Sequence, residues 1–472
     1  MRCRTVLLFL AGVVALLALA CRLMPAEGLR LGPFTLRTPT LSQVMYPEVL
    51  SPVVSVDTAE MAALQRYHDS TALYRHWMDS SGCRFWLPDN DESFFDSLFA
   101  AMETAAQHGR RLRVMHYGDS QLEMDHISSR LRARLQERFG GGGPGMVPLQ
   151  PIVSSPTVSQ WHSGELPRLA PFGDSLTIRS QGNYGPLVQC FRLEGRTVSS
   201  FLLGRNKHCD EHVRQCSHVG VLYRPHAALL HTSMVVQSPK QGRAAPADTS
   251  ILSGDSLVAL ALWDADTAAT RLRVTLQGSA EVYGVLLDDA PGVAVDNIPM
   301  RGCSGQQFTQ IDSALLAASY ALLDVGLIIL QFGGNSVPFI KGEKALETYC
   351  QSIGRQIDRL HRCCPHASIL FVGPADMAAQ IDGTIQSYPY MERIIDGLRA
   401  TVNAHGAAYW SQYDAMGGRN TIKSWVRQGL AGSDYIHFSQ QGADLMGDLL
   451  ADALLTMYRY YRLRRTSRSD SL

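Results

Sequence analysis

One serine in this chain lies where a nucleophile would be useful. Ser120 closes a Gly-Asp-Ser tripeptide that follows an apolar, strand-like run at 112–117 and precedes an amphipathic helical pattern. At the start of a helix, unpaired backbone N–H groups favour the negative charge that develops during acyl transfer. We therefore predict that Ser120 is a catalytic nucleophile. The other two Gly-Asp-Ser tripeptides precede strand-like runs and are interpreted as hairpin turns.

A histidine near the C-terminus has the neighbour that a catalytic base needs. Asp434 and His437 are three residues apart, so on one turn the carboxylate can hold the imidazole in the tautomer that accepts a serine proton. His116, Asp125 and His126 lie closer to the serine in sequence. A base on the same strand or helix seldom reaches back over the nucleophile, so we keep these three as fallback candidates.

Two loops could supply hydrogen-bond donors for an oxyanion. Gly302 lies in a glycine-bearing loop before a helical stretch, where its backbone N–H could point at an oxyanion. Asn335 follows the apolar run 325–332, which predicts a buried parallel strand. Open α/β sheets bind ligands beyond the carboxyl ends of their strands, so the Asn335 amide is expected in that crevice. With the Ser120 N–H, these groups would form an oxyanion hole.

Each of these residues, taken singly, also has a structural interpretation. Ser120 could be a helix N-cap, Asn335 a turn residue, Gly302 a helix C-cap, and His437 a partly buried histidine bonded to a carbonyl. The ordered set favours catalysis, because a serine after a strand, an asparagine after a strand and a late Asp-x-x-His seldom occur together by accident.

In order, spacing and flanking elements, these blocks resemble those of the SGNH/GDSL esterases and lipases. The blocks are GDSQ with Ser120, the loop glycine Gly302, GGN with Asn335, and DYIH with Asp434 and His437. The resemblance covers about 111–150 and 291–458. It implies a serine nucleophile, a histidine base, an aspartate that orients the base, and a flavodoxin-like α/β/α sandwich with a parallel sheet. The family often has aspartate where Ser336 follows the asparagine, so the local support of this loop differs.

The stretch between the two parts of the resemblance is far longer than a usual connection in an α/β domain. Short runs of β-type residues, separated by turn residues, predict an inserted β-sandwich. These runs are LTIRS, VQCFRL, TVSSFLL, HVGVLYR, ALLHTSMVV, LVALALW, TRLRVTL and AEVYGVLL. The arrangement resembles some bacterial peptidoglycan O-acetylesterases, in which the insertion resembles a sugar-binding module. Trp161, Tyr184, Tyr223 and Trp263 could stack on sugar rings or lie in the core.

We expect six segments along the chain, with helices at 61–78 and 91–107 and a glycine run at 140–145 as a junction or a mobile loop. The segments are a signal peptide or membrane anchor at 1–24, an arm at 25–60, the N-terminal helices and first part of the hydrolase at 61–145, a β-rich insertion at 146–290, the rest of the hydrolase at 291–460, and a basic, disordered tail at 461–472. Carbohydrate binding is a candidate role for the insertion at 146–290.

The N-terminus predicts export. Arg2 and Arg4 precede an uncharged apolar run at 5–21, the layout of a secretory segment or signal anchor. A retained anchor is slightly favoured over cleavage after Ala20, and lipidation of Cys21 is a third alternative. In each case we expect the hydrolase in the bacterial cell envelope, outside the cytoplasm.

The composition and the positions of the cysteines limit which partners, metals and disulfides we expect. The 472 residues carry a formal net charge of zero and no basic patch interleaved with aromatics, which argues against nucleic acid. The cluster of His and Cys at 208–218 meets no common zinc spacing, so no metal and no cofactor are predicted. An exported chain permits disulfides, and we expect one between Cys209 and Cys216. Cys350 with Cys363 or Cys364 is another pair to consider.

These interpretations together predict an exported serine esterase that removes O-acetyl groups from a cell-wall or extracellular glycan. Two alternatives use the same patterns: an O-acetyltransferase with the same triad, and a non-catalytic glycan-binding envelope protein. Acyl length, glycan identity and oligomeric state depend on loops and surfaces that sequence patterns do not shape.

Overall fold

The structure of the protein, a computed structural model, describes most of the chain beyond residue 83. Described are 84–469 except 152, 174–181, 205–208, 226–229, 238–244 and 253–256, and before them 9, 12–16, 18–19, 22, 29–31, 34–36 and 78. The chain divides into two compact units, residues 1–61 and 62–472. The expected helix at 61–78 and most of the expected leader lie outside the described residues.

Within the first unit, a short hairpin lies in the segment expected to be an arm. Its antiparallel strands are β1 (Leu29–Leu31) and β2 (Phe34–Leu36). Across the described part of the chain, no helix combines the length and the apolar character needed to cross a membrane.

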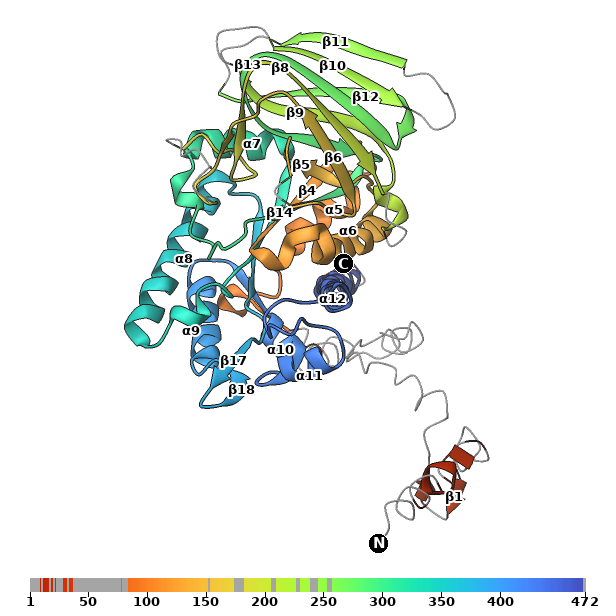
Figure 1. Cartoon of the computed structure of the whole chain (residues 1–472), viewed down its shortest axis with the longest axis vertical. Helices are drawn as coiled ribbons and strands as arrows, with labels where there is room; N and C mark the ends of the chain where they lie inside the picture. Colours follow the sequence, from red (N-terminus) through yellow and green to blue (C-terminus); the bar gives the residue numbers. More distant parts are fainter. Residues whose placement is uncertain are drawn as a thin grey trace. The chain divides into compact units, whose positions relative to one another are not determined.

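A six-stranded sheet forms the centre of the second unit (Figure 1). The strand order is β14-β4-β15-β16-β19-β3, parallel throughout except for β3, which pairs antiparallel with β19. The strands are β3 (Phe85–Trp86), β4 (Arg111–Gly118), β14 (Gly292–Pro299), β15 (Val325–Gln331), β16 (Ser368–Gly373) and β19 (Ala408–Ser411). The carboxyl ends of β14, β4 and β15 therefore meet at one edge, where Gly302, Ser120 and Asn335 follow them.

Helices cover both faces of this sheet, because its strands bury side chains alternately on each face. In β15, Leu327 and Ile329 join one apolar cluster, and Ile328 and Leu330 join the other. The cluster of Ile328 and Leu330 includes residues of α7 (Ser313–Leu323), α8 (Glu343–Cys363) and α9 (Met391–Ala404). The cluster of Leu327 and Ile329 includes residues of α5 (Asp96–Ala105), α6 (His126–Phe139), α11 (Thr421–Arg427) and α12 (Gln440–Ser469). This confirms the predicted three-layer α/β/α fold. The helix expected at 91–107 is shorter and begins at Asp96.

Several connections between these elements are short turns or small elements of their own. α10 (Gln412–Met416) follows β19, and a two-stranded hairpin precedes α9. The hairpin consists of β17 (Ala378–Ile381) and β18 (Thr384–Ser387). Asp312 begins α7 as its N-cap, since its carboxylate accepts the Leu315 N–H at 2.8 Å.

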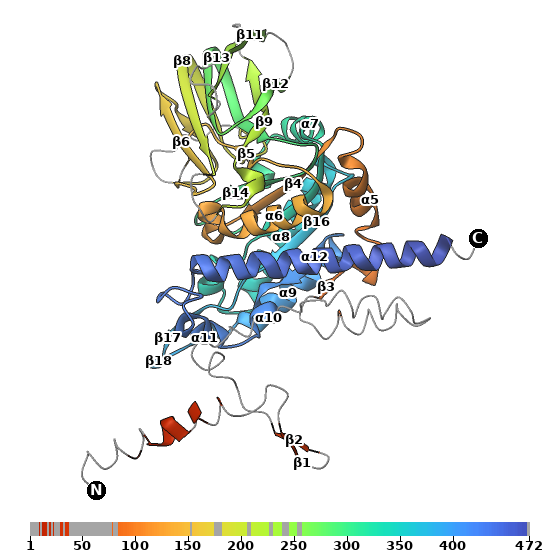
Figure 2. The ribbon, with the colours of Figure 1, turned by 90° about the vertical axis from the view of Figure 1, so that its right-hand side faces the viewer.

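The segment between α6 and β14 folds into an antiparallel β domain, as predicted, drawn above the α/β part in Figures 1 and 2. Its strands are β5 (Gly145–Val147), β6 (Val158–Ser163), β7 (Arg168–Leu169), β8 (Cys190–Leu203), β9 (Cys216–Pro225), β10 (Leu230–Gln237), β11 (Ala245–Leu252), β12 (Ala259–Ala269) and β13 (Arg271–Asp288). The runs VQCFRL and TVSSFLL are parts of β8, and TRLRVTL and AEVYGVLL are parts of β13. The run LTIRS lies entirely outside the described residues.

The strand β13 organises this domain, because it pairs with four other strands along its length. It pairs with β8 and β10 in its first half and with β9 and β5 in its second half. The domain has an apolar core of its own, formed mainly by β8, β9, β12 and β13. Tyr223 and Trp263 lie buried in this core, and Tyr184 is buried as well. Of the four predicted stacking aromatics, Trp161 alone is exposed, at 52%.

The glycine run at 140–145 is the junction where the chain leaves the α/β part and returns to it. The outgoing backbone lies directly on the returning backbone, with the Val293 N–H donating to Gly140 O at 2.9 Å. A Cβ added to Gly141 would lie 2.2 Å from Val293 O, and one added to Gly143 would lie 2.2 Å from Leu287 O. No side chain fits between the two segments, so glycine is required at this crossing.

A buried charge cluster joins the β domain to the sheet beside this junction. Arg113 of β4 contacts Asp288 at the end of β13, and its Nη1 donates to Asp296 Oδ1 of β14 at 2.7 Å. The Met146 N–H of β5 donates to the same Asp296 oxygen at 2.7 Å. All three charged side chains are buried. Burial raises the pKa of Asp296, although the neighbouring Arg113 opposes the rise.

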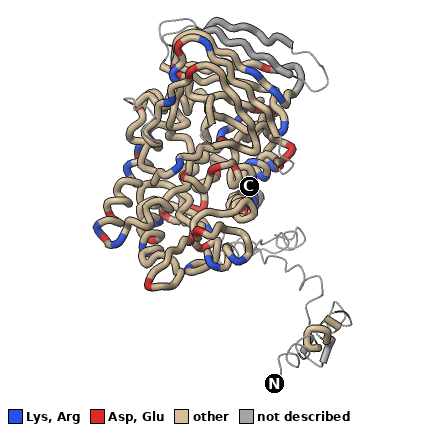
Figure 3. Tube along the Cα trace, in the orientation of Figure 1, with Lys and Arg blue, Asp and Glu red and all other residues tan. Residues whose placement is uncertain are grey.

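The C-terminal segment from 461 is not the disordered end that we expected, because α12 continues to Ser469. The long helix crosses the view of Figure 2. Its last turns pack on α5 through ion pairs, with Arg464 Nη1 3.1 Å from Asp96 Oδ2 and Arg465 Nη1 2.9 Å from Glu103 Oε2. Basic residues of the tail thus meet acidic residues of a neighbouring helix. Figure 3 shows charges of both signs interspersed over the described chain.

The expected disulfides are wrong, because none of the seven cysteines among the described residues forms a disulfide. Cys216 is fully buried in the core of the β domain, whereas the Cys209 thiol donates to the Pro156 carbonyl at 3.3 Å. Cys350 and Cys363 lie on one helix, α8, thirteen residues apart. At about 1.5 Å of rise per residue they are about 20 Å apart, well beyond the reach of a disulfide.

The crossing of backbones at the junction makes a testable prediction. We expect Gly141→Ala to lower the free energy of unfolding by about 3 kcal/mol or more, because the new methyl group collides with the Val293 carbonyl. Gly109→Ala is the matched control, since Gly109 also has a positive φ, 66°, but open space around it. It should cost about 1 kcal/mol. Denaturant unfolding measures the loss of stability in both variants. An equal loss in Gly141→Ala and Gly109→Ala would show that the two backbones at the junction leave room for a methyl group.

Candidate active site

Ser120 lies at the carboxyl end of β4, but it does not begin an α-helix. It opens a 3-10 turn, η2 (Ser120–Asp125), and α6 begins at His126. Asp119 is the N-cap of this turn, with its Oδ1 accepting the Gln121 N–H at 3.0 Å. This bond gives Asp119 a structural role at the start of the turn. The predicted helix start was therefore six residues too early, although the serine does follow the strand as expected.

The structure brings Ser120, His437 and Asp434 together from distant parts of the chain. Ser120 Oγ lies 2.9 Å from His437 Nε2, and His437 Nδ1 lies 2.7 Å from Asp434 Oδ2. The hydroxyl, imidazole and carboxylate thus form a continuous chain of hydrogen bonds, which is the arrangement expected of the predicted nucleophile, base and orienting carboxylate. The histidine and aspartate side chains are each 47% exposed, so the group is open to substrate.

A tight loop holds the aspartate and the histidine in place. The pairing of Ala431 with Phe438 closes this loop, and the Gly432 N–H donates to His437 O at 2.8 Å. Asp434 Oδ1 accepts the His437 N–H at 3.1 Å, while Oδ2 faces the imidazole. Burial acts to raise the pKa of Asp434, but hydrogen bonds from His437 and the loop N–H groups leave it below its ordinary value. The carboxylate is therefore ionised where it meets the ring.

Asn335 and Gly302 both line a groove beside the site, but Asn335 alone of the two also lines the pocket of Ser120. Asn335 lines the same pocket as Ser120 and His437. Its Nδ2 donates one hydrogen to Cys303 O at 3.0 Å, and the amide has a second hydrogen to offer an oxyanion. Gly302 lines the adjoining groove and not the pocket of Ser120. The oxyanion roles of Gly302 and Asn335 therefore both stay predictions.

Sequence reasoning missed Gln121, which ties the serine turn to the histidine loop. Gln121 Nε2 donates to Ile436 O at 2.7 Å, and Gln121 Oε1 accepts the Phe438 N–H at 3.2 Å. One side chain thus binds the backbone on both sides of His437. The sequence signal was a polar residue at the position where the GDSL motif has leucine.

The fallback bases have other partners. His116 is fully buried, with Nε2 3.0 Å from Gln331 Oε1 and Nδ1 2.9 Å from Ser128 Oγ. Burial lowers the pKa of His116 to about 3, so its ring stays neutral. His126 lines a separate pocket beside the β domain. None of these residues is the hydrogen-bond partner of the serine, which is His437.

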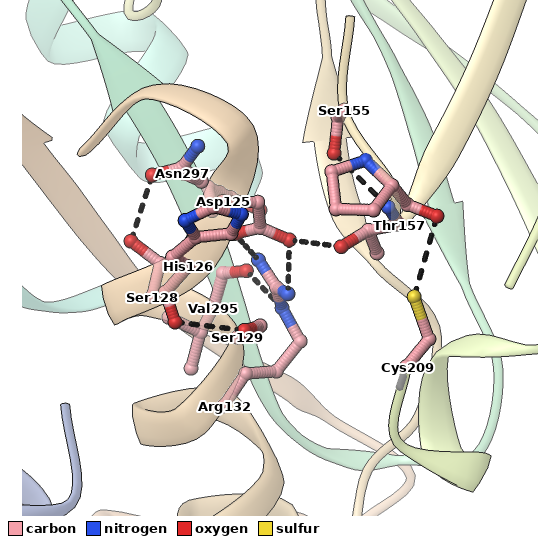
Figure 4. Close-up of polar contacts among 12 residues, drawn as sticks. Asp125, His126, Ser128, Ser129, Arg132, Ser155, Thr157, Cys209, Val295 and Asn297 are labelled. Carbon is pink, nitrogen blue, oxygen red and sulfur yellow. Dashed lines mark hydrogen bonds and ion pairs between the residues drawn. The ribbon is translucent and has the colours of Figure 1, made fainter. Parts of the chain in front are cut away.

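Asp125 braces the end of the serine turn (Figure 4). Its carboxylate accepts two bonds from Arg132, at 2.8 and 3.1 Å, and one from Thr157 Oγ1 at 2.7 Å. Met124 and Asp125 both have a φ of 61°, which is uncommon for residues other than glycine. Because Thr157 belongs to the insertion, the β domain contributes to holding this strained backbone next to the nucleophile.

Among the residues that the structure describes, no group of three or more histidine, cysteine or acidic side chains could hold a metal ion.

Comparison with known proteins agrees with this geometry. Residues 252–445 match the model of the GDSL-like Lipase/Acylhydrolase family, a range that includes Asn335, Asp434 and His437 but not Ser120, which the insertion separates from them. The chain therefore carries a GDSL-like lipase/acylhydrolase domain over these residues, which identifies it as a carboxylic ester hydrolase. No curated protein matches the chain in sequence.

Among solved structures, one of a peptidoglycan O-acetylesterase is similar over 79% of this chain and 99% of its own, with a TM-score of 0.62 and 19% identity. This overlap is longer than the α/β part alone, so the shared fold extends into the β domain. A family two carbohydrate esterase from Clostridium thermocellum, in complex with cellohexaose, covers 58% of this chain and 95% of its own at 11% identity and a TM-score of 0.24. An acetyl xylan esterase covers 34% and 81%, at 11% identity and a TM-score of 0.27.

The hydrogen bonds of Gln121 predict a kinetic effect. We expect Gln121→Leu to lower kcat on a chromogenic acetyl ester by roughly 10- to 100-fold with little change in KM, because His437 would lose its alignment with Ser120. Gln121→Glu keeps the acceptor for the Phe438 N–H but loses the donor to Ile436 O, so its kcat should be intermediate. Gln351→Leu, on the exposed face of α8, is the control. Wild-type kcat in Gln121→Leu would contradict the positioning role.

Asp119 predicts a pH-dependent stability. Burial raises the pKa of Asp119 from 3.8 to about 6, opposed by its bond from the Gln121 N–H. Because the pKa of Asp119 is higher in the folded than in the unfolded state, its protonated carboxyl stabilises the folded state below pH 4. This contribution to stability is lost as the pH rises through about 6. Asp119→Asn keeps an oxygen acceptor without ionising. Its free energy of unfolding relative to wild type should rise by on the order of 3 kcal/mol between pH 4 and 7. Denaturant unfolding at several pH values measures this, and a constant difference would refute the assignment.

Proposed function

We propose that this protein is an exported serine esterase that removes O-acetyl groups from a cell-wall or extracellular glycan through an acyl-enzyme intermediate. The observation that carries the proposal is the 2.9 Å contact between Ser120 Oγ and His437 Nε2, with Asp434 behind the histidine. The match to the GDSL-like Lipase/Acylhydrolase family supports an ester bond as the bond that is broken. The likeness in fold to a peptidoglycan O-acetylesterase supports an acetylated glycan as the substrate.

The first half of the proposed reaction is acylation of the serine. His437 Nε2 takes the Ser120 proton as Oγ attacks the acetyl carbonyl, and Asp434 stabilises the imidazolium that forms. The tetrahedral oxyanion would be held by the Ser120 N–H and the Asn335 amide, with Gly302 as the further predicted donor. When the intermediate collapses, the C–O bond to the glycan breaks and His437 returns the proton to the departing hydroxyl.

The second half releases the acetyl group. A water molecule gives its proton to His437 Nε2 while its oxygen attacks the acyl carbonyl. The bond to Ser120 Oγ then breaks, His437 returns the proton to the serine, and acetate leaves. Each proton thus passes through one imidazole, which agrees with the single histidine that faces the serine in the described part of the chain.

Export is supported by the N-terminal sequence, in which Arg2 and Arg4 precede the apolar run 5–21. Cell-wall and extracellular glycans lie on the far side of the membrane, so the proposed substrate requires this placement.

The proposal makes a prediction for the nucleophile. Ser120→Ala should lower acetate release from O-acetylated peptidoglycan by at least about 10³-fold, because no other group can form the acyl-enzyme, and its thermal unfolding should match that of wild type. Asn335→Ala should cost roughly 10² to 10³ in kcat. Released acetate is measured enzymatically, and a serine-directed fluorophosphonate probe should label wild type but not Ser120→Ala.

Two results would overturn the proposal. Undiminished acetate release by Ser120→Ala would remove the serine from the mechanism. Wild-type protein that acetylates an added oligosaccharide without releasing acetate would instead be an O-acetyltransferase.

A further inference from the structure

Resting on the proposed function, we infer that Phe339 and the groove next to it form a subsite for the sugar adjacent to the acetylated residue. Phe339 is 78% exposed, more than any other large apolar side chain of the described residues. Single exposed apolar residues are common on proteins. Phe339 differs because it lines both the pocket of Ser120 and the adjoining groove, and so it lies on the path between them.

The turn that carries Phe339 presents it rigidly. Its neighbours Val337 and Ile340 are buried, at 1% and 5% exposed, and so anchor the turn on both sides. Backbone hydrogen bonds close the turn, with the Ser336 N–H donating to Gly333 O at 2.9 Å and the Phe339 N–H donating to Ser336 O at 3.0 Å. The ring is therefore held out toward solvent by a fixed backbone. Such preorganisation lowers the cost of ordering a contact on binding.

The groove beyond Phe339 has the size and polarity that a sugar requires. Together with the open solvent at its mouth, its empty volume is about 1430 Å³, against 730 Å³ for the Ser120 pocket measured in the same way. Asn335 and Phe339 line both, so the two spaces adjoin at these residues. Polar side chains that could bond sugar hydroxyls line the groove together with the ring: Ser304, Gln306, Asn335, Ser336, Lys344 and Thr348.

A pyranose ring fits this combination because it has an apolar C–H face and a rim of hydroxyl groups. The face can lie on an aromatic ring, whose surface is apolar and weakly negative, while the hydroxyls bond the polar side chains. A glycan is a chain, so with an acetylated sugar at Ser120, the next sugar must occupy space continuous with the pocket. Phe339 thus becomes the stacking surface, in place of the aromatic residues that the sequence suggested in the β domain.

The test compares substrates of different length. We measure kcat/KM for O-acetylated peptidoglycan oligosaccharides and for a small chromogenic acetyl ester that reaches only the Ser120 pocket. Phe339→Ala should lower the ratio of the first value to the second by about tenfold, mainly through KM for the oligosaccharide. Phe339→Trp keeps a flat face and should retain the ratio, whereas Phe339→Leu keeps apolar bulk without the face and should lose it.

Trp161→Ala is the matched comparison, since Trp161 is an exposed aromatic on β6 of the insertion. It should change the ratio less than Phe339→Ala. A larger effect at Trp161 would move the sugar platform to the β domain and overturn the inference. An unchanged ratio in Phe339→Ala would also overturn it, as would a change confined to the preference for longer acyl chains, because Phe339 would then contact the acyl group.

Binding to the Ser120→Ala protein separates this inference from the proposed function. Calorimetry with the same oligosaccharides should show affinity that falls about tenfold when Phe339→Ala is added. If wild type releases no acetate from the glycan but this loss of affinity is seen, the subsite stands and the proposed function falls. If acetate is released and affinity is unchanged, the subsite falls and the proposed function stands. If neither is seen, both fall.

Discussion

The contact of Arg113 with Asp288 and Asp296 is the interaction on which the arrangement of the second unit depends. The chain leaves the α/β part after α6, builds nine strands, and must return as β14 in parallel register beside β4. A buried arginine needs carboxylate partners, since an unpaired charge in the interior costs several kcal/mol. Because one partner ends β13 and the other lies in β14, satisfying Arg113 fixes the return of the chain next to the strand that carries Ser120.

The position of β4 in turn sets the active site. Ser120 follows this strand, and it meets a histidine that lies more than three hundred residues later in the chain. Gln121 and Asp125 brace the serine turn from two sides, one toward the histidine loop and one toward Thr157 of the insertion. The β domain thus contributes to the geometry of the nucleophile without supplying any member of the proposed triad.

Local patterns in the sequence predicted the layers of the fold and the residues that meet at the site. Strands such as β15 are continuous apolar runs, and the short motifs around Ser120, Asn335 and His437 follow such runs or precede a helix. What the sequence did not predict depends on contacts between distant segments. The merging of two runs into β13 reflects pairing with four other strands, and the bonds of Gln121 exist only once the histidine loop is in place. The predicted disulfide between Cys209 and Cys216 was wrong because the spacing of two cysteines in the sequence does not show where their side chains lie in the fold. Cys216 is buried in the core of the β domain, and the two cysteines form no disulfide.

The closeness of the two ends of the insertion bears on how such an enzyme could arise. Gly145 of β5 and Leu287 of β13 are paired across adjacent strands, so a brief loop could bridge them in an ancestor that lacked the extra module. A loop that joins Gly145 to Leu287 would remove the strands between them and keep Asp288, which directly follows Leu287. The hydrolase scaffold could therefore acquire or lose this module in a single genetic event while Arg113 keeps both of its carboxylate partners.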